Sequence, residues 1–191
     1  MRLGIDLDGV VAAFNDGWTE LHNAEFGGEL HPDMVTMWNG LHTLAGFESM
    51  GEFWAWARGN GERPSVFRHL QLLPDAIETL QRLDGARHRI VIITSKPRWA
   101  IPDTLRWLAD HEVPTTEVHF VDRKHEVPCD AYLDDSPLVL PDLVTHRPDA
   151  LVCRFVRAWN DPVDGAHDVA GWNEFERLVS DFAVTRGDDA Q

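Results

Sequence analysis

Short apolar runs rich in β-branched residues alternate along this chain with segments of helical periodicity. The runs predict five buried strands, at Leu3 to Leu7, Arg89 to Ile93, Val118 to Val121, Ala131 to Leu133 and Ala150 to Phe155. Strands that alternate with helices are typical of a parallel sheet covered by helices on both faces. This order of elements predicts an α/β fold with its functional groups at the carboxyl ends of the strands.

Four helices are predicted between and after these strands. Pro74 suits the first turn of a helix, and Ser136-Pro137 resemble an N-cap followed by a first helical position. Two more helices are expected over about residues 102–111 and 171–182. Helices in these places supply the crossovers that parallel strands need.

The alternation is interrupted between residues 14 and 73. About sixty residues separate the first strand from the next helix, far more than an ordinary connection, so this stretch must have structure of its own. It is rich in Trp and Phe. We interpret residues 14–73 as a small, mostly helical cap inserted into a core formed by residues 1–13 and 74–191. A chain of 191 residues is long enough for one such core but too short for two full domains.

The formal net charge of -15 argues against a nucleic-acid polymer as partner, because binding to duplex phosphates depends on a basic surface. A small phosphorylated ligand stays compatible, since a metal ion and a few cations can hold it. No apolar run approaches the ~20 residues of a membrane span, and no signal-peptide pattern opens the sequence. Both observations predict a protein without membrane contacts, and Cys129 and Cys153, which are expected to be reduced thiols, predict a cytoplasmic one. A homodimer is left open.

Four groups of polar residues follow predicted strands in a fixed order. They are Asp6-Leu7-Asp8-Gly9, Thr94-Ser95, Lys124 and Asp134-Asp135. Taken one at a time, the first could equally be a strand running into a turn, the second a helix cap and the third a surface lysine. Three strands that each end in an acidic or hydroxyl pair, with a lysine shortly before the last pair, are difficult to obtain from turn chemistry alone. The conjunction indicates a catalytic site.

This four-motif pattern resembles the haloacid-dehalogenase superfamily, and the resemblance spans nearly the whole predicted core. It implies a three-layer, Rossmann-like α/β fold with strand order 5-4-1-2-3 and a cap inserted after the first strand. Within the superfamily, several features are similar to the 5'(3')-deoxyribonucleotidases. They are the Thr94-Ser95 pair, the spacing from Lys124 to Asp134-Asp135, Leu73-Pro74 before a helix and Gly171-Trp172 in the last one. Lys96-Pro97, after the hydroxyl pair, departs from the pattern.

The carboxylates at the expected strand ends predict both a metal and a nucleophile. Asp6, Asp8, Asp134 and Asp135 would converge at one rim, where their mutual repulsion calls for a cation. Mg²⁺ is expected, because it prefers hard carboxylate oxygens. Asp6 is expected to form an aspartyl-phosphate, and Asp8 to act as general acid and then general base.

Thr94, Ser95 and Lys124 are expected to bind the phosphate oxygens. Lys96 lies beside the hydroxyl pair and could reach the phosphate or lie at the surface, so it is given no catalytic role. No histidine is assigned to a metal, because the ten histidines lack the spacing of a zinc site.

Most cap aromatics are expected to form a core, and Trp38 is the one expected to contact substrate by stacking on a base. The leading hypothesis is hydrolysis of (deoxy)nucleoside monophosphates. The alternative is a phosphatase for another small phosphate ester, such as a sugar phosphate or a biosynthetic intermediate. A receiver-like phosphoaspartate domain is the non-enzyme alternative, against which Asp8 and the large cap argue.

Overall fold

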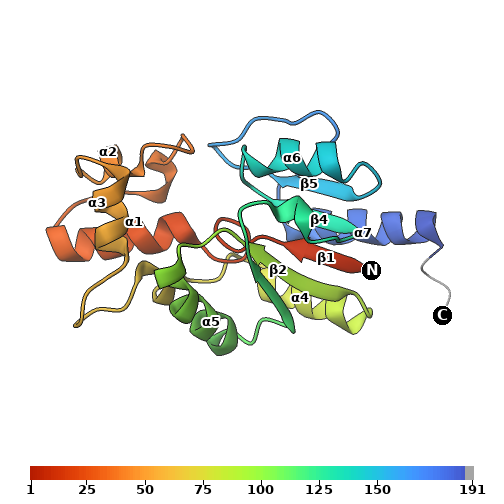
Figure 1. Cartoon of the computed structure of the whole chain (residues 1–191), viewed down its shortest axis with the longest axis horizontal. Coiled ribbons are helices and arrows are strands. Elements are labelled where there is room, and N and C mark those ends of the chain that lie inside the picture. Colours follow the sequence, from red (N-terminus) through yellow and green to blue (C-terminus); the bar gives the residue numbers. More distant parts are fainter. Residues whose placement is uncertain (188–191) are drawn as a thin grey trace.

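The computed structural model describes residues 1–187 and contains a six-stranded sheet in which every neighbouring pair is parallel (Figure 1). The strands are β1 (Arg2–Ile5), β2 (Arg89–Thr94), β3 (Glu117–Phe120), β4 (Ala131–Asp134), β5 (Leu151–Phe155) and β6 (His167–Val169). Their order is β3-β2-β1-β4-β5-β6. The predicted order 5-4-1-2-3 is therefore confirmed for five strands, and the direction of winding reverses at β1, where α/β sheets bind ligands.

The prediction of five strands was wrong by one, because β6 was missed. This strand pairs with the edge strand β5, and its His167 and Asp168 are exposed. Such a short polar segment shows no apolar run. Its position depends on a tertiary contact: the guanidinium of Arg154 donates to both carboxylate oxygens of Asp168, at 2.6 and 2.7 Å.

Four helices accompany the sheet: α4 (Ala76–Gly85), α5 (Ile101–Asp110), α6 (Val139–His146) and α7 (Trp172–Arg186). Alternate residues of β2 point into two different apolar layers. Ile90 and Ile92 belong to the cluster that contains the buried residues of α4, α5 and α7. Val91 and Ile93 belong to a second cluster, with the buried leucines of α6. The sheet is thus covered on both faces, as predicted.

The helix boundaries differ from prediction by a few residues at several ends. Pro74 lies in a turn before α4, which begins at Ala76 after Asp75 adopts a positive φ of 63°. Ser136 was predicted as the N-cap of α6, but the helix begins at Val139 and its N-cap is Leu138. The hydroxyl of Ser136 accepts hydrogen bonds from the amides of Leu138 and Val139 at 3.3 Å each, in the turn that leads into the helix. No helix within residues 1–187 is long and apolar enough to cross a membrane.

Residues 14–73, which we call the cap segment, contain α1 (Phe14–Phe26), α2 (Leu41–Leu44) and α3 (Met50–Ala57), with single turns of 3₁₀-helix between and after them. The segment lies beyond one end of the sheet (Figure 1). Its two connections run side by side, because the amide of Leu73 donates to the carbonyl of Val11 at 2.8 Å. The predicted helical content is confirmed.

Most of the cap aromatics are core residues, as expected. Trp18, Phe53 and Phe67 are almost fully buried, and they belong to the same apolar cluster as Leu3 of β1. The cap segment and the core are therefore joined by one continuous hydrophobic cluster. Their division into two domains at residues 13 and 74 stays a prediction.

Candidate active site

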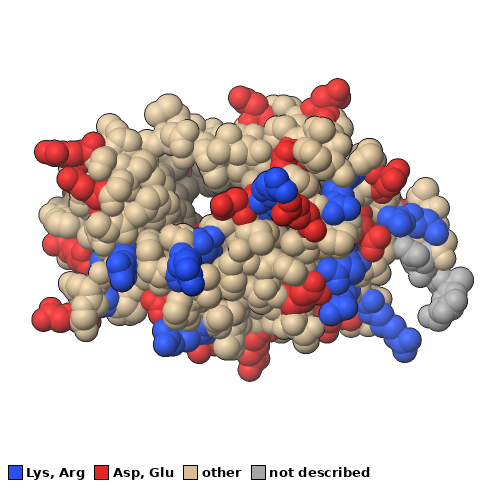
Figure 2. Space-filling model, viewed as in Figure 1, with Lys and Arg blue, Asp and Glu red and all other residues tan. Residues whose placement is uncertain are grey.

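The sheet brings the predicted motifs together because β1 pairs with both β2 and β4. Asp6, Thr94 and Asp134 consequently lie at neighbouring carboxyl ends. A cavity of about 410 Å³ opens there, within the size range of small-molecule sites. Figure 2 shows the molecule hollowed between the cap segment and the core. The residues that line the cavity include Asp6, Asp8, Gly9, Thr94, Ser95, Lys124 and Asp135 from the predicted motifs.

Lys124 is the centre of a buried ion-pair network. Its Nζ lies 2.6 Å from Oδ1 of Asp6 and 2.6 Å from Oδ2 of Asp134. Burial alone would lower the pKa of Lys124, but the two carboxylates outweigh that effect and raise the pKa above its ordinary value. Lys124 therefore stays charged beside Asp6. Asp134 is also held by the amide of Ser136, which donates to Oδ1 at 2.9 Å.

Asp135 is a buried carboxylate with an unsatisfied oxygen. Oδ2 accepts a hydrogen bond from Nε1 of Trp159 at 3.1 Å, whereas Oδ1 has no partner among the described residues. Burial and the neighbouring Asp6 and Asp134 raise the pKa of Asp135 well above its ordinary value. A bound cation would stabilise the charged carboxylate of Asp135 and so lower its pKa again.

The chemistry of these donors fits a hard divalent cation. Carboxylate oxygens of Asp6, Asp134 and Asp135 lie within 4.8 Å of one another. Oxygen ligands of this kind, together with the unpartnered Oδ1 of Asp135, suit Mg²⁺. The carboxylate of Asp8 is not part of this group, so its predicted role as a metal ligand stays a prediction.

Asp8 forms an ion pair with Lys96, whose side chain is 1% exposed. The Nζ of Lys96 also lies 3.5 Å from the centre of the Phe67 ring, in a cation–π contact. Burial raises the pKa of Asp8 although Lys96 opposes the shift. A raised pKa favours the protonated form that a general acid needs. Lys96 was left without a role on sequence grounds, and the structure places it beside the expected acid.

The two hydroxyl residues after β2 lie differently. Thr94 is 1% exposed and lines the cavity. Ser95 also lines the cavity, but its hydroxyl donates to the carbonyl of Val121 at 3.0 Å. The phosphate-binding role of both residues stays a prediction, and Ser95 would have to give up or share its present bond.

Three residues of the segment after β5 support the site and were missed. Both Nε and Nη2 of Arg157 donate to the carbonyl of Gly9, at 3.0 and 2.6 Å. The side-chain amide of Asn160 donates to the carbonyl of Asp135 at 2.7 Å, while Trp159 binds the carboxylate of that residue. The only available signal was the polar Arg-Ala-Trp-Asn sequence after a strand. This sequence matches no known motif from which the contacts of its side chains could be predicted.

Gly9 is required by a close approach. Its φ is 77°, in the left-handed region, and a Cβ at this position would lie 2.2 Å from Oδ2 of Asp135. From the sequence alone, the Asp-Gly pair could be an ordinary turn at the end of a strand. In the structure, this turn brings the backbone of Gly9 against the carboxylate of Asp135.

The remaining wall of the cavity is apolar and comes mainly from the cap segment. Its residues include Phe14, Val35, Met37, Trp38, Leu41, Met50 and Trp54. Trp38 is 38% exposed and lines the cavity, which is compatible with the predicted contact to substrate. That contact stays a prediction.

Comparisons with known proteins agree with this geometry. The model of the family "5' nucleotidase, deoxy (Pyrimidine), cytosolic type C protein" matches residues 1–186. A protein of Chlorobaculum tepidum named "Putative 5'(3')-deoxyribonucleotidase" is 28% identical over 147 residues, which are 71% of this chain and 69% of that protein.

Solved structures show the fold. One described as a dehalogenase with intermediate complex has a TM-score of 0.62 and 15% identity, and the match covers 93% of this chain and 96% of that chain. A HAD family hydrolase from Deinococcus radiodurans R1, with bound phosphate and sodium, has a TM-score of 0.60 and 14% identity, over 95% and 96% of the two chains. The chain is thus a phosphatase of the haloacid-dehalogenase superfamily, and it belongs to the family of cytosolic type C 5'-nucleotidases.

Proposed function

We propose that this enzyme removes phosphate from (deoxy)nucleoside monophosphates with the help of Mg²⁺ and an aspartyl-phosphate at Asp6. One observation carries the proposal: Asp6, Lys124 and Asp135 meet in a cavity that is also lined by aromatic and apolar residues of the cap segment. The charged part suits a phosphate with its cation, and the apolar part suits a flat base. The nucleotidase family of the chain supports the same substrate class.

Asp6, Asp134 and Asp135 would hold the Mg²⁺. Any contact between Asp8 and the ion would have to leave the Asp8 carboxylate available for proton transfer. Bound Mg²⁺ supplies the positive charge that lets a phosphate dianion approach these carboxylates. Lys124 contributes charge from the protein itself, because its ammonium is already held against Asp6. Thr94 and Ser95 would donate to the phosphate oxygens from the end of β2.

In the first step, a carboxylate oxygen of Asp6 attacks phosphorus, and the bond from phosphorus to the ester oxygen breaks. Asp8 in its acid form gives its proton to that oxygen, so that the nucleoside leaves as an alcohol. Lys96 then stabilises the carboxylate that remains on Asp8, since the two side chains are already paired. The phosphoryl group is now an acyl phosphate on Asp6.

In the second step, the Asp8 carboxylate takes a proton from water, and the water oxygen attacks phosphorus. The bond between phosphorus and the Asp6 oxygen breaks, which releases inorganic phosphate and restores both aspartates. The same group thus serves as acid and then as base. This second role also argues against a long-lived phosphoaspartate signal.

A second candidate substrate class is another small phosphate ester, because the charged part of the cavity recognises only the phosphate. The apolar wall separates the two classes. If Trp38 stacks on a base, the contact contributes ~1–3 kcal/mol of binding energy that a sugar phosphate cannot obtain.

The test is a pair of kcat/KM measurements, for a deoxynucleoside monophosphate and for ribose 5-phosphate. In the wild type we expect the nucleotide to be favoured by roughly ten- to hundredfold, as for one lost stacking contact. Trp38→Ala should narrow the gap, whereas Phe26→Ala, an exposed cap aromatic outside the cavity, should leave it unchanged. Equal values for both substrates in the wild type would reject the nucleotidase proposal in favour of the other ester class. An unchanged gap in the Trp38 variant would remove only that residue from the pocket.

A further inference from the structure

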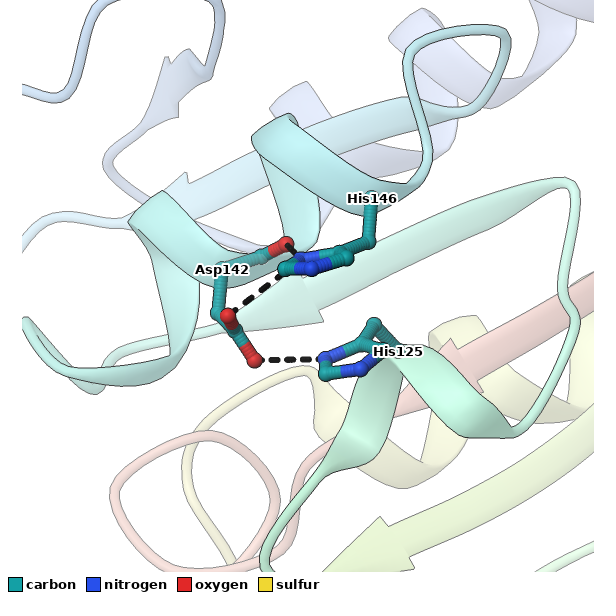
Figure 3. A group of neighbouring side chains, drawn as sticks. All are labelled: His125, Asp142 and His146. Carbon is teal, nitrogen blue, oxygen red and sulfur yellow. Dashed lines mark hydrogen bonds and ion pairs between the residues drawn. The ribbon is translucent and has the colours of Figure 1, made fainter.

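Three metal-binding side chains meet at the surface outside the active site (Figure 3). His125 belongs to the 3₁₀ turn at Lys124–Glu126, and Asp142 and His146 belong to α6. Nδ1 of His125 lies 2.5 Å from Oδ2 of Asp142, and Nδ1 of His146 lies 3.3 Å from Oδ1 of the same carboxylate. Asp142 is therefore shared by both imidazoles.

The backbone holds this group together. Asp142 and His146 are four residues apart on α6, a spacing that places both on one face of the helix. The turn that carries His125 is fastened to the end of α6, because Nε of Arg147 donates to the carbonyl of His125 at 2.6 Å. The rings of His125 and His146 stack with centres 4.2 Å apart and planes 13° apart. The two histidines are thus neighbours across two separate elements.

The dimensions of the group suit a small ion. Zinc binds imidazole nitrogen and carboxylate oxygen at about 2.0–2.2 Å in a tetrahedron, which puts neighbouring ligand atoms about 3.3–3.5 Å apart. Here one ligand atom from each of the three residues lies within 4.8 Å of the other two. The two rings stack almost in parallel, and Nδ1 of His146 also lies 2.9 Å from the backbone carbonyl of Asp142. At least one imidazole therefore has to rotate before both rings can direct a nitrogen at the same ion. The side chains of His146 and Asp142 are 50% and 43% exposed, so an ion can reach them and water can complete the coordination.

The donor set differs in kind from that of the active site. Asp6, Asp134 and Asp135 offer only oxygen, which suits Mg²⁺. Two imidazoles with one carboxylate suit zinc and its neighbours among the divalent transition metals. The two groups should therefore select different ions.

We propose that His125, Asp142 and His146 form a binding site for a divalent transition-metal ion of the zinc class, separate from the Mg²⁺ centre. An ion there would join the turn at 124–126 to α6. That turn carries Lys124, and the turn before α6 contains Ser136, whose amide donates to the carboxylate of Asp134. A bound ion would consequently hold together the two segments that support the buried ion-pair network. Because it binds the folded state, it would also raise the melting temperature.

The experiment is a calorimetric titration of Zn²⁺ into the full chain, in excess Mg²⁺ so that the active-site carboxylates are occupied. The wild type should bind one Zn²⁺ at this site, with a rise in Tm. His146→Ala and Asp142→Asn should each weaken the affinity at least about tenfold, since even the loss of a supporting residue costs that much at metal sites. His167→Ala, an exposed histidine of β6, is the matched control and should bind as the wild type does.

His146 is half exposed in the last turn of α6, so its replacement should leave the fold intact, which far-ultraviolet circular dichroism would verify. Asp6→Asn should keep the Zn²⁺ site even though it removes the proposed nucleophile, which makes this test independent of the proposed reaction. No Zn²⁺ binding by the wild type, or equal affinity in the wild type and His146→Ala, would overturn the proposal.

Discussion

The ammonium of Lys96 forms an ion pair with the carboxylate of Asp8, across 88 residues of sequence. Lys96 is buried against the Phe67 ring, so a residue of the cap segment covers the charge that faces the expected acid. Asp8 has a second carboxylate oxygen, Oδ1, without a partner among the described residues. One side of the carboxylate is therefore anchored, and the other is free for proton exchange.

Replacing Lys96 with glutamine should lower kcat by roughly ten- to hundredfold, less than the ~10²–10⁴ of general acid–base catalysis itself, because Lys96 acts through Asp8. KM should change less than kcat, since the ion pair of Lys96 with Asp8 orients the general acid and does not bind the nucleobase of the substrate. Steady-state kinetics would show the difference. Arg98→Gln, a nearby exposed cation, is the control. A variant of Lys96 with kcat within twofold of wild type would contradict the positioning role.

Asp6→Asn should abolish turnover and leave the fold intact, because the amide keeps the shape and loses the nucleophilic charge. Phosphate release from a deoxynucleoside monophosphate measures the first effect, and circular dichroism the second. Asp16→Asn, an exposed acid of α1 that does not line the cavity, should be fully active. Residual activity within tenfold of wild type would reject covalent catalysis by Asp6.

Gly9→Ala should cause a large loss of activity, because the new Cβ would lie 2.2 Å from Oδ2 of Asp135 and the backbone has a φ of 77°. Either Asp135 or the turn has to move. Gly171→Ala is a suitable control, since a Cβ there meets nothing within 4 Å and φ is -167°, which any residue adopts. Equal kcat/KM in the two variants would show that the contact between Gly9 and Asp135 does not matter.

Chelation of divalent metal should remove activity, and added Mg²⁺ should restore it, because the carboxylates of Asp6, Asp134 and Asp135 converge. Asp135→Asn should raise the Mg²⁺ concentration needed for half-maximal rate by at least about tenfold. His146→Ala should need the same Mg²⁺ as the wild type, since it lies in the other candidate metal group. Unchanged rates in EDTA would reject the metal requirement.

Much of the catalytic arrangement could be predicted before the structure. Asp6, Thr94 and Asp134 each follow an apolar run, and the direction of a parallel strand decides at which end of the sheet its last residue lies. The helical content of the cap segment could also be predicted, because so long an interruption with many aromatic residues needs a core of its own. These inferences depend on local periodicity and chain direction.

The supporting contacts could not be predicted in this way. Arg157 reaches the carbonyl of Gly9 across 148 residues, and neither position carries a sequence signal for the other. From the sequence, Lys96 could have reached the phosphate or remained at the surface. In the structure its side chain is buried against Phe67 of the cap segment. The edge strand β6 shows no apolar run, and its place depends on Arg154.

The sequence by itself determined the α/β class, the order of the catalytic motifs and the end of the sheet at which they gather. Apolar period and chain direction are local properties, so they can be read residue by residue. Only the tertiary structure decided that Lys96 pairs with Asp8, that Trp159 holds Asp135, and that His125 meets His146 and Asp142. Those pairings depend on which elements become neighbours when the chain folds back on itself. At Lys96 and Asp135 burial adds a second reason, because a buried charge without a partner is costly.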